Sequence, residues 1–184
     1  TMFSNTSLTL TTGTWYNLAF VYNEAEVSNA DKMKVYINGV VQTNSVAGAA
    51  LTTLNSSSAA FEIGNLGGST STPMSGKVSN VAIWTSVLSA ATILTVYNNG
   101  RPADLTSLSP IAWWKMGQEA FCPDYTATPN VWTIPDQIGS NDGTSAGNPD
   151  LVGEAPQSFA NGLGVGLNVD ARRGDSGFSD DNAL

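Results

Sequence analysis

The sequence predicts an all-β protein: an antiparallel β-sandwich with one short closing helix and a loop-rich C-terminal extension. Three observations support this prediction. Short runs with alternating apolar residues recur through residues 1–100. An Asn-Gly pair, Asn38-Gly39, separates two such runs, and this pair favours the type I′ turn of a β-hairpin. Helical spacing of apolar residues occurs in one segment, directly after Trp84.

Four segments carry the strand pattern. Residues 8–23 are predicted to form two strands around a Thr-Gly turn, and residues 32–44 form the Asn-Gly hairpin. Residues 59–68 add a short strand that ends in a glycine-rich loop, and residues 76–84 alternate as one further strand.

The helix is predicted after Leu88. Ser89 is a good N-cap because its hydroxyl can accept a hydrogen bond from a first-turn amide. Ile93, Leu94 and Tyr97 recur at helical spacing, and Gly100 is expected to end the helix. A helix this short is only marginally stable in isolation. We therefore expect its apolar stripe to pack on the sandwich and to close one end of it.

The composition and the apolar patterning of the sequence change after residue 100. Residues 101–109 are predicted to be a linker, and residues 111–117 one more apolar strand. The rest is rich in Gly, Asn, Asp and Pro, which favours turns and extended arms over a second independent core. The predicted organisation is therefore a sandwich over 1–100, the linker, and an extension or degenerate second unit over 110–184.

Composition excludes several classes of function. The chain has 184 residues, of which 41% are hydrophobic and 12% charged, and its net charge is −8. Seven Lys and Arg residues are too few for nucleic-acid binding. No apolar run approaches the roughly 20 residues of a membrane-spanning helix, so we expect no membrane insertion. Because so few residues are charged, the surface must consist mainly of Ser, Thr, Asn and Gly. Such a surface is typical of an extracellular or particle-surface β-protein.

Catalysis is not expected. The chain contains no histidine, which excludes Ser–His–Asp and Cys–His catalysis. Cys122 is the single cysteine and is followed by an acid rather than a base, so it is predicted to be a half-buried free thiol. Glu24 and Glu26 form the one close pair of glutamates, but they lie in a predicted loop and no third acid follows at useful spacing.

Two groups of residues are candidate binding sites. Asp136, Asn141 and Asp142 supply oxygen ligands of the kind that Ca²⁺ prefers, although the same side chains also suit Asx-turns. Calcium is the one candidate cofactor. Three tryptophans beside loops could instead contact a glycan or a neighbouring subunit, or pack internally: Trp113, Trp114 and Trp132.

The segments GTWYNLAFVYN, KVYINGVVQ, FEIGN and GKVSNVAIWTSVLSAATILTVYNNG together resemble the second half of a laminin-G-like domain of the concanavalin A-like lectin/glucanase superfamily. The resemblance covers roughly residues 8–100. It implies a jelly-roll sandwich closed by one short helix, and loops that often bind calcium or glycans. The glucanase members carry a Glu-x-Asp-x-Glu strand, which this sequence lacks.

A second, partial resemblance lies in IAWWKMG and IPDQIGSNDGTSAGNP, which are similar to the beginning of such a domain. Either residues 1–100 complete a domain begun upstream, or residues 110–184 fold back and supply the early strands. We favour the first, with Thr1 an internal position of a longer protein. Residues 97–160 also resemble the tails of structural proteins from marine phages.

These observations lead us to expect a non-catalytic structural or interaction module on the outside of a particle. A virion decoration or appendage protein is the form we favour, at the virion surface or another extracellular location. Its partners would be neighbouring structural subunits or further copies of itself. The alternative is a lectin-like carbohydrate-binding module, Ca²⁺-assisted, in an adhesin or fibre that meets surface glycans.

Overall fold

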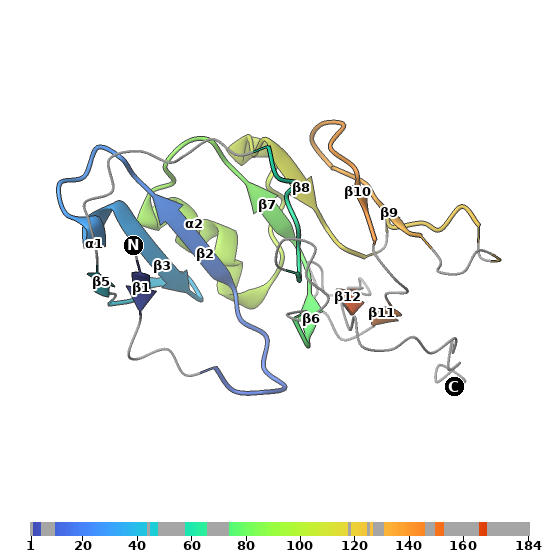
Figure 1. Ribbon diagram of the computed structural model, residues 1–184, viewed down its shortest axis with the longest axis horizontal. Helices are drawn as coiled ribbons and strands as arrows, with labels where there is room; N and C mark the ends of the chain where they lie inside the picture. The colour runs from blue at the N-terminus through green and yellow to red at the C-terminus, as the bar shows by residue number, and fades with distance from the viewer. Residues whose placement is uncertain are drawn as a thin grey trace. The chain divides into compact units, whose positions relative to one another are not determined.

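The structure is a computed structural model, shown in Figure 1. It describes residues 2–4, 10–43, 45–47, 58–65, 74–117, 119–124, 126, 131–145, 150–152 and 166–168. Two compact units divide the chain. Unit 1 comprises Thr1–Ser58, Trp84–Ser109 and Ser158–Ala160. Unit 2 comprises Ala59–Ile83, Pro110–Gln157 and Asn161–Leu184.

Unit 1 contains an antiparallel three-stranded sheet in the order β2-β3-β4, and Figure 1 shows helix α2 beside it. A separate antiparallel pair joins β1 to β5. The elements are β1 (Met2–Ser4), β2 (Leu18–Tyr22), α1 (Asn29–Lys32), β3 (Met33–Ile37), β4 (Val40–Val41), β5 (Ser45–Ala47) and α2 (Ala90–Tyr97), followed by 3-10 turns at Asn98–Gly100 and Thr106–Leu108.

The predicted hairpin is confirmed. Asn38 and Gly39 join β3 to β4 with φ angles of 51° and 77°, and two consecutive positive φ angles are the signature of a type I′ turn. Gly39 also lies directly against α2, close to Leu94 and Tyr97. The turn that ends the hairpin is therefore also the contact point between the sheet and the helix.

The predicted helix is confirmed, although it ends earlier than expected. The hydroxyl of Ser89 accepts a hydrogen bond from the amide of Thr92 at 3.1 Å, as the N-cap prediction requires. The helix stops at Tyr97 because Asn98, and not Gly100, takes the first left-handed conformation, with φ at 46°. Asparagine tolerates this conformation better than most residues. Ile93 is the fully buried residue of the helix stripe.

Unit 2 consists of short antiparallel pairs: β7 with β8, β9 with β10, and a small sheet in the order β11-β12-β6. Its elements are β6 (Lys77–Val78), β7 (Val81–Ile83), β8 (Ala112–Trp114), β9 (Thr133–Ile134), β10 (Gly143–Thr144), β11 (Asp150–Val152) and β12 (Gly166–Asn168). The strand predicted at 111–117 is confirmed in its first half as β8, and residues 115–117 are not part of a strand.

The extension contributes to a core that it shares with the segment before position 84. Trp114 and Met116 are buried with Ile134, and Val81 and Ile83 of the preceding segment pack against them. The core is not independent, because residues before position 84 supply part of it. Strand β8 of the extension therefore pairs with β7 of the preceding segment. The domain boundaries at 100 and 110 stay predictions.

Two other strand predictions are wrong in detail. Residues 58–65, the described part of the segment around the predicted strand at 59–68, contain no strand. Gly64 takes a φ of 82°, outside the strand region, and the ring of Phe61 stacks on Trp114 with a centroid separation of 5.8 Å. The strand predicted at 76–84 divides into β6 and β7 because Asn80 adopts a left-handed φ of 52°.

The described strands are short and pair antiparallel throughout, in agreement with the predicted all-β class. Residues 10–12 of the segment predicted as the first strand are irregular, and residues 8 and 9 lie outside the described residues. The closed jelly-roll sandwich stays a prediction, as do the arms predicted for the last part of the chain.

Candidate functional site

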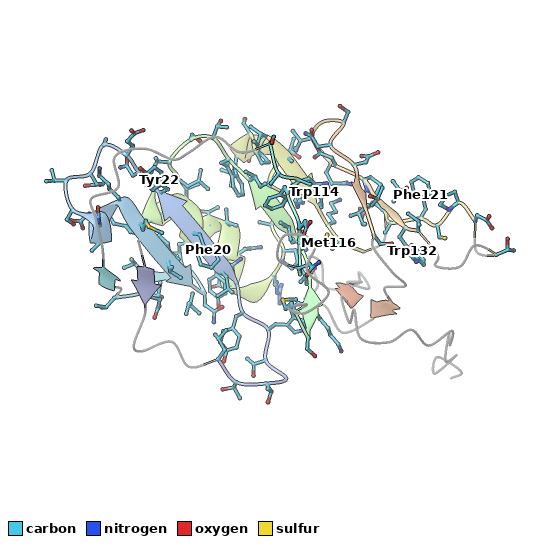
Figure 2. All side chains as sticks on the ribbon, in the orientation of Figure 1. Phe20, Tyr22, Trp114, Met116, Phe121 and Trp132 are labelled. Atoms are coloured by element: carbon cyan, nitrogen blue, oxygen red, sulfur yellow. The ribbon has the colours of Figure 1, made fainter. Side chains whose placement is uncertain are left out.

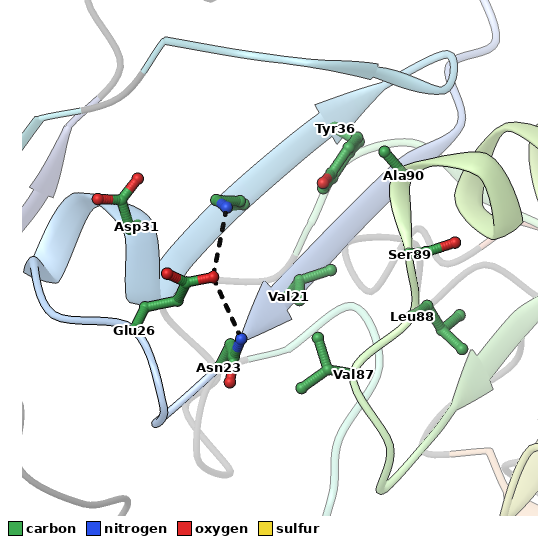
Figure 3. Close-up of a pocket in the computed structure, with 10 residues that line it drawn as sticks. Val21, Asn23, Glu26, Asp31, Tyr36, Val87, Leu88, Ser89 and Ala90 are labelled. Atoms are coloured by element: carbon green, nitrogen blue, oxygen red, sulfur yellow. Dashed lines mark hydrogen bonds and ion pairs between the residues drawn. The ribbon is translucent and has the colours of Figure 1, made fainter.

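A pocket of about 250 Å³ lies in unit 1, between the sheet and the beginning of α2. One wall is polar and carries Glu26, Lys34 and Asn23, while Val21 and Leu88 supply apolar surface. The Oε1 atom of Glu26 accepts a hydrogen bond from Asn23 Nδ2 at 3.3 Å and lies 4.0 Å from Lys34 Nζ, as Figure 3 shows. The pocket therefore offers both hydrogen-bond donors and hydrogen-bond acceptors beside an apolar surface.

The most informative group in this pocket is the hydroxyl of Tyr36. Tyr36 is only 6% exposed, and no hydrogen bond from its hydroxyl is present within the described part of the chain. Figure 3 shows the hydroxyl end of the ring pointing toward the space bounded by Val21 and Glu26. Within the described residues, the buried side-chain atoms without a hydrogen-bond partner are Asn17 Oδ1 and Tyr22 Oη. The Tyr36 hydroxyl opens into the pocket instead, where water or a ligand can pair with it.

The sequence did not single out Lys34 or Tyr36. The signal was present in the hairpin register, because alternation places Val21, Lys34 and Tyr36 on the same face of β2 and β3. What the sequence could not supply is the position of α2 over that face. Glu26, considered above only as a catalytic candidate, faces this pocket, whereas Glu24 is exposed and does not line it.

The three tryptophans predicted as contact residues are buried. Trp113, Trp114 and Trp132 are 5%, 7% and 3% exposed. The indole nitrogen of Trp114 donates to the backbone carbonyl of Asn141 at 2.8 Å, and that of Trp113 donates to Asn80 at 3.3 Å. Their placement favours the packing alternative, and their contact with a glycan or subunit stays a prediction.

The three residues predicted as calcium ligands do come together, in unit 2, where Asp136 is the centre of a hydrogen-bonded loop. One carboxylate oxygen of Asp136 accepts from the amides of Trp113 and Ile138, at 2.9 and 3.1 Å. The other accepts from the amide and the side chain of Asn141, at 3.2 and 3.1 Å. Asp142 accepts in turn from the amide of Asp136 at 2.9 Å.

This arrangement matches the Asx-turn alternative. Each oxygen of Asp136 already has two donors, so a cation could bind there only by displacing N–H groups. Within the described residues no group of three acidic, cysteine or histidine side chains is placed to hold a metal. Calcium binding by Asp136, Asn141 and Asp142 stays a prediction, and the observed role of Asp136 is to tie β8 to the loop after β9.

The stability of unit 2 is expected to depend on pH through Asp136. Burial raises the pKa of this carboxyl, but the hydrogen bonds from Trp113, Ile138 and Asn141 outweigh it and leave the pKa below its ordinary value. Its stabilisation is therefore complete above about pH 4, the pKa of an unfolded aspartate, and is lost as the pH falls through the lower folded pKa. Urea unfolding midpoints measured between neutral pH and pH 3 should fall more for the native protein than for Asp136→Asn.

An exposed aromatic side chain of unit 1 lies on the other face of its sheet. Phe20, labelled on β2 in Figure 2, is 74% exposed. Alternation along β2 and the β2–β3–β4 register place Leu18 and Val40, both also exposed, on the same face. We call these three residues the Phe20 face, although Val35, which lies opposite Phe20 on β3, is only 4% exposed. It is opposite to the pocket, because Val21 and Tyr36 belong to the alternate positions.

These features define an antiparallel β-protein with a capped helix packed on a hairpin, a small polar pocket and an exposed apolar sheet face. The family model described as the concanavalin A-like lectin/glucanases superfamily, of laminin G type, matches residues 3–94, which is half of the chain. The chain belongs to this superfamily. No curated protein and no solved structure matches it. Among the described residues, no helix has the length and apolarity needed to cross a bilayer.

Proposed function

We propose that this protein is a non-catalytic interaction module on the outside of a particle, specifically a decoration or appendage protein of a virion of the marine-phage type. Its superfamily is compatible with a non-catalytic module. In this proposal the antiparallel sheets form part of a jelly-roll sandwich. Neighbouring structural subunits are its partners, and the virion surface is its location.

The observation that carries this proposal is the Phe20 face. A large aromatic side chain that is 74% exposed on a regular strand, with Leu18 and Val40 exposed on the same face, is unfavourable in water and typical of a surface that another protein covers. The acidic composition, with a net charge of −8, supports a soluble protein that avoids nucleic acid.

Immunogold labelling tests the location. Antibodies raised against the purified chain are expected to decorate the outside of intact virions from the source culture. Mass spectrometry of the same particles should contain peptides of this chain in amounts comparable to those of known structural subunits. Label confined to cell debris, with no peptide in purified particles, would contradict the proposal.

The second candidate function is carbohydrate binding, and the pocket of unit 1 is the observation that favours it. Sugar hydroxyls both donate and accept, as Glu26, Lys34 and the Tyr36 hydroxyl require, and the C–H face of a sugar ring packs well on apolar side chains such as Val21. A calcium-assisted site is the version expected from the family resemblance.

Pocket variants test this second candidate. If a glycan array identifies a ligand, Tyr36→Phe and Glu26→Gln should each weaken its binding by about tenfold, the value of one well-formed hydrogen bond. Glu24→Gln is the matched control, because it makes the same change in charge outside the pocket and should bind normally. Binding without loss in the two pocket variants would place the glycan elsewhere, and sensitivity to EDTA would report a calcium requirement.

A further inference from the structure

Two asparagine–glycine pairs lie in the described part of unit 1, and their surroundings differ. Asn38-Gly39 forms the turn between β3 and β4, and Asn99-Gly100 follows α2. A third pair, Asn161-Gly162, lies outside the described residues. An asparagine followed by glycine is prone to lose ammonia, because glycine has no side chain to hinder attack of its amide nitrogen on the asparagine Cγ. The two described pairs therefore have the same chemistry in two structural settings.

Asn38 is held by the hairpin and by the helix packed on it. Its amide donates to the carbonyl of Asn17 at 2.9 Å, and its Oδ1 atom accepts from the amide of Asn17 at 2.9 Å. Gly39 lies so close to α2 that an added Cβ would be 2.8 Å from Leu94 Cδ1. Attack by the Gly39 nitrogen requires Asn38 to release its side chain and to rotate the peptide group that follows it. The hydrogen bonds to Asn17 and the contact with α2 oppose both movements.

Asn99 is held much less firmly. Asn99 and Gly100 are both exposed, and their turn is closed by a 3.2 Å hydrogen bond from the amide of Arg101 to the carbonyl of Asn98. Within the described residues, the side chain of Asn99 makes no hydrogen bond. The ψ of Asn99 is 38°, which directs the Gly100 nitrogen away from Cγ, so this peptide group must also rotate before reaction. Here the rotation breaks an exposed hydrogen bond at a helix end, where local opening costs little free energy.

We propose that Asn99 is a site of spontaneous covalent modification, whereas the fold protects Asn38. The deprotonated amide nitrogen of Gly100 attacks Cγ of Asn99, and the new N–C bond closes a five-membered succinimide ring. The side-chain nitrogen takes up a proton and leaves as ammonia. Water then opens the ring at either carbonyl, which gives aspartate or isoaspartate. Water is the co-reactant, and the step needs neither an enzyme nor an oxidant.

The modification changes the charge of unit 1 at one end of α2. Each event adds one carboxylate to a chain whose net charge is −8. The new carboxylate belongs to the residue directly after the C-cap, near the negative end of the helix dipole, which disfavours it. The modified chain should therefore unfold at a lower urea concentration, and its fraction should rise with the age of the protein. This inference is independent of the particle location and of the pocket.

Peptide mapping by mass spectrometry tests the proposal on the full chain, incubated for days at mildly acidic and at mildly alkaline pH. In the folded protein, the peptide that contains Asn99 should convert at least about tenfold faster than the peptide that contains Asn38. Its conversion should also be faster at the alkaline pH, because the attacking amide must lose its proton. In urea that unfolds the chain, the two sites should convert at similar rates, because neither is then held by the fold.

Gly100→Ala should slow conversion of Asn99 at least about tenfold, in the folded chain and in urea, because the added Cβ hinders the attack. Gly13→Ala is the matched control. It places alanine at a similar positive φ, 75°, but not after an asparagine, and should leave the rate unchanged.

Three results would overturn the proposal: equal rates at Asn38 and Asn99 in the folded chain, an unreactive Asn99 where the unfolded chain reacts, or normal conversion in Gly100→Ala. None of them would contradict the particle location, which the immunogold experiment tests separately.

Discussion

Replacing Gly39 with alanine is expected to lower the free energy of unfolding by about 3 kcal/mol. Two separate effects add. The φ of Gly39 is 77°, a conformation that costs an L-residue about 1 kcal/mol. An added Cβ would also lie 2.8 Å from Leu94 Cδ1 and 3.3 Å from both Leu94 Cα and Tyr97 Cδ1. The Leu94 methyl can rotate away, but the helix backbone cannot without a shift of α2.

Gly13→Ala is the matched control for the backbone effect. Gly13 has nearly the same φ, 75°, but no heavy atom lies within 4 Å of the position of an added Cβ. Its substitution should therefore cost only about 1 kcal/mol. Urea unfolding followed by circular dichroism measures both variants. Equal losses in the two would mean that the hairpin turn does not contact α2.

A second-site change separates the two contacts at Gly39. In the Gly39→Ala background, Leu94→Ala removes the methyl that lies closest to the new Cβ, and should restore about 1 kcal/mol relative to the sum of the single changes. Strict additivity of the two substitutions would contradict the packing explanation.

Replacing Asp136 with alanine is expected to have a similarly large effect on unit 2, also about 3 kcal/mol. The substitution leaves the amides of Trp113, Ile138 and Asn141 without their acceptor, and the amide of Trp113 is buried. Because that amide belongs to β8, the loss should loosen the core around Trp114 and Met116. Tryptophan fluorescence during urea unfolding is the appropriate measurement.

Two further variants are expected to lower the free energy of unfolding by smaller amounts than Asp136→Ala. Asp142→Ala removes a single acceptor, for the amide of Asp136, and should cost only about 1 kcal/mol. Asp136→Asn keeps one carbonyl oxygen but directs an amide group at the other donors, so its loss should be intermediate. If Asp142→Ala were as damaging as Asp136→Ala, the carboxylate of Asp136 would not be the centre of this loop.

Local signals in the sequence were sufficient to predict the features that depend on neighbouring residues. Asn38-Gly39 specified a turn that only residues tolerant of positive φ can make, and Ser89 specified the first turn of α2 by its hydroxyl. Asp136, Asn141 and Asp142 were interpreted from their spacing as either calcium ligands or Asx-turn residues, and in the structure Asp136 accepts from backbone amides.

The errors arose where distant residues compete with a local preference. Phe61 stacks on Trp114, and the segment around it forms no strand, although its alternation favours one. Asn80 interrupts a strand pattern because its left-handed conformation lets its amide reach the carbonyl of Lys115, 35 residues further on and 3.3 Å away. Neither partner is recognisable from local sequence.

The sequence by itself therefore determined the all-β class, the hairpin, the capped helix and the exclusion of histidine-based catalysis, since each follows from residue type and short-range spacing. Only the tertiary structure decided that Tyr36 lines a pocket, that the predicted contact tryptophans are buried, and that Phe20 is exposed while Val35 opposite it is buried. The physical reason is that burial depends on which elements pack together. Period-two alternation assigns residues to one face or the other, but it cannot say which face a helix covers.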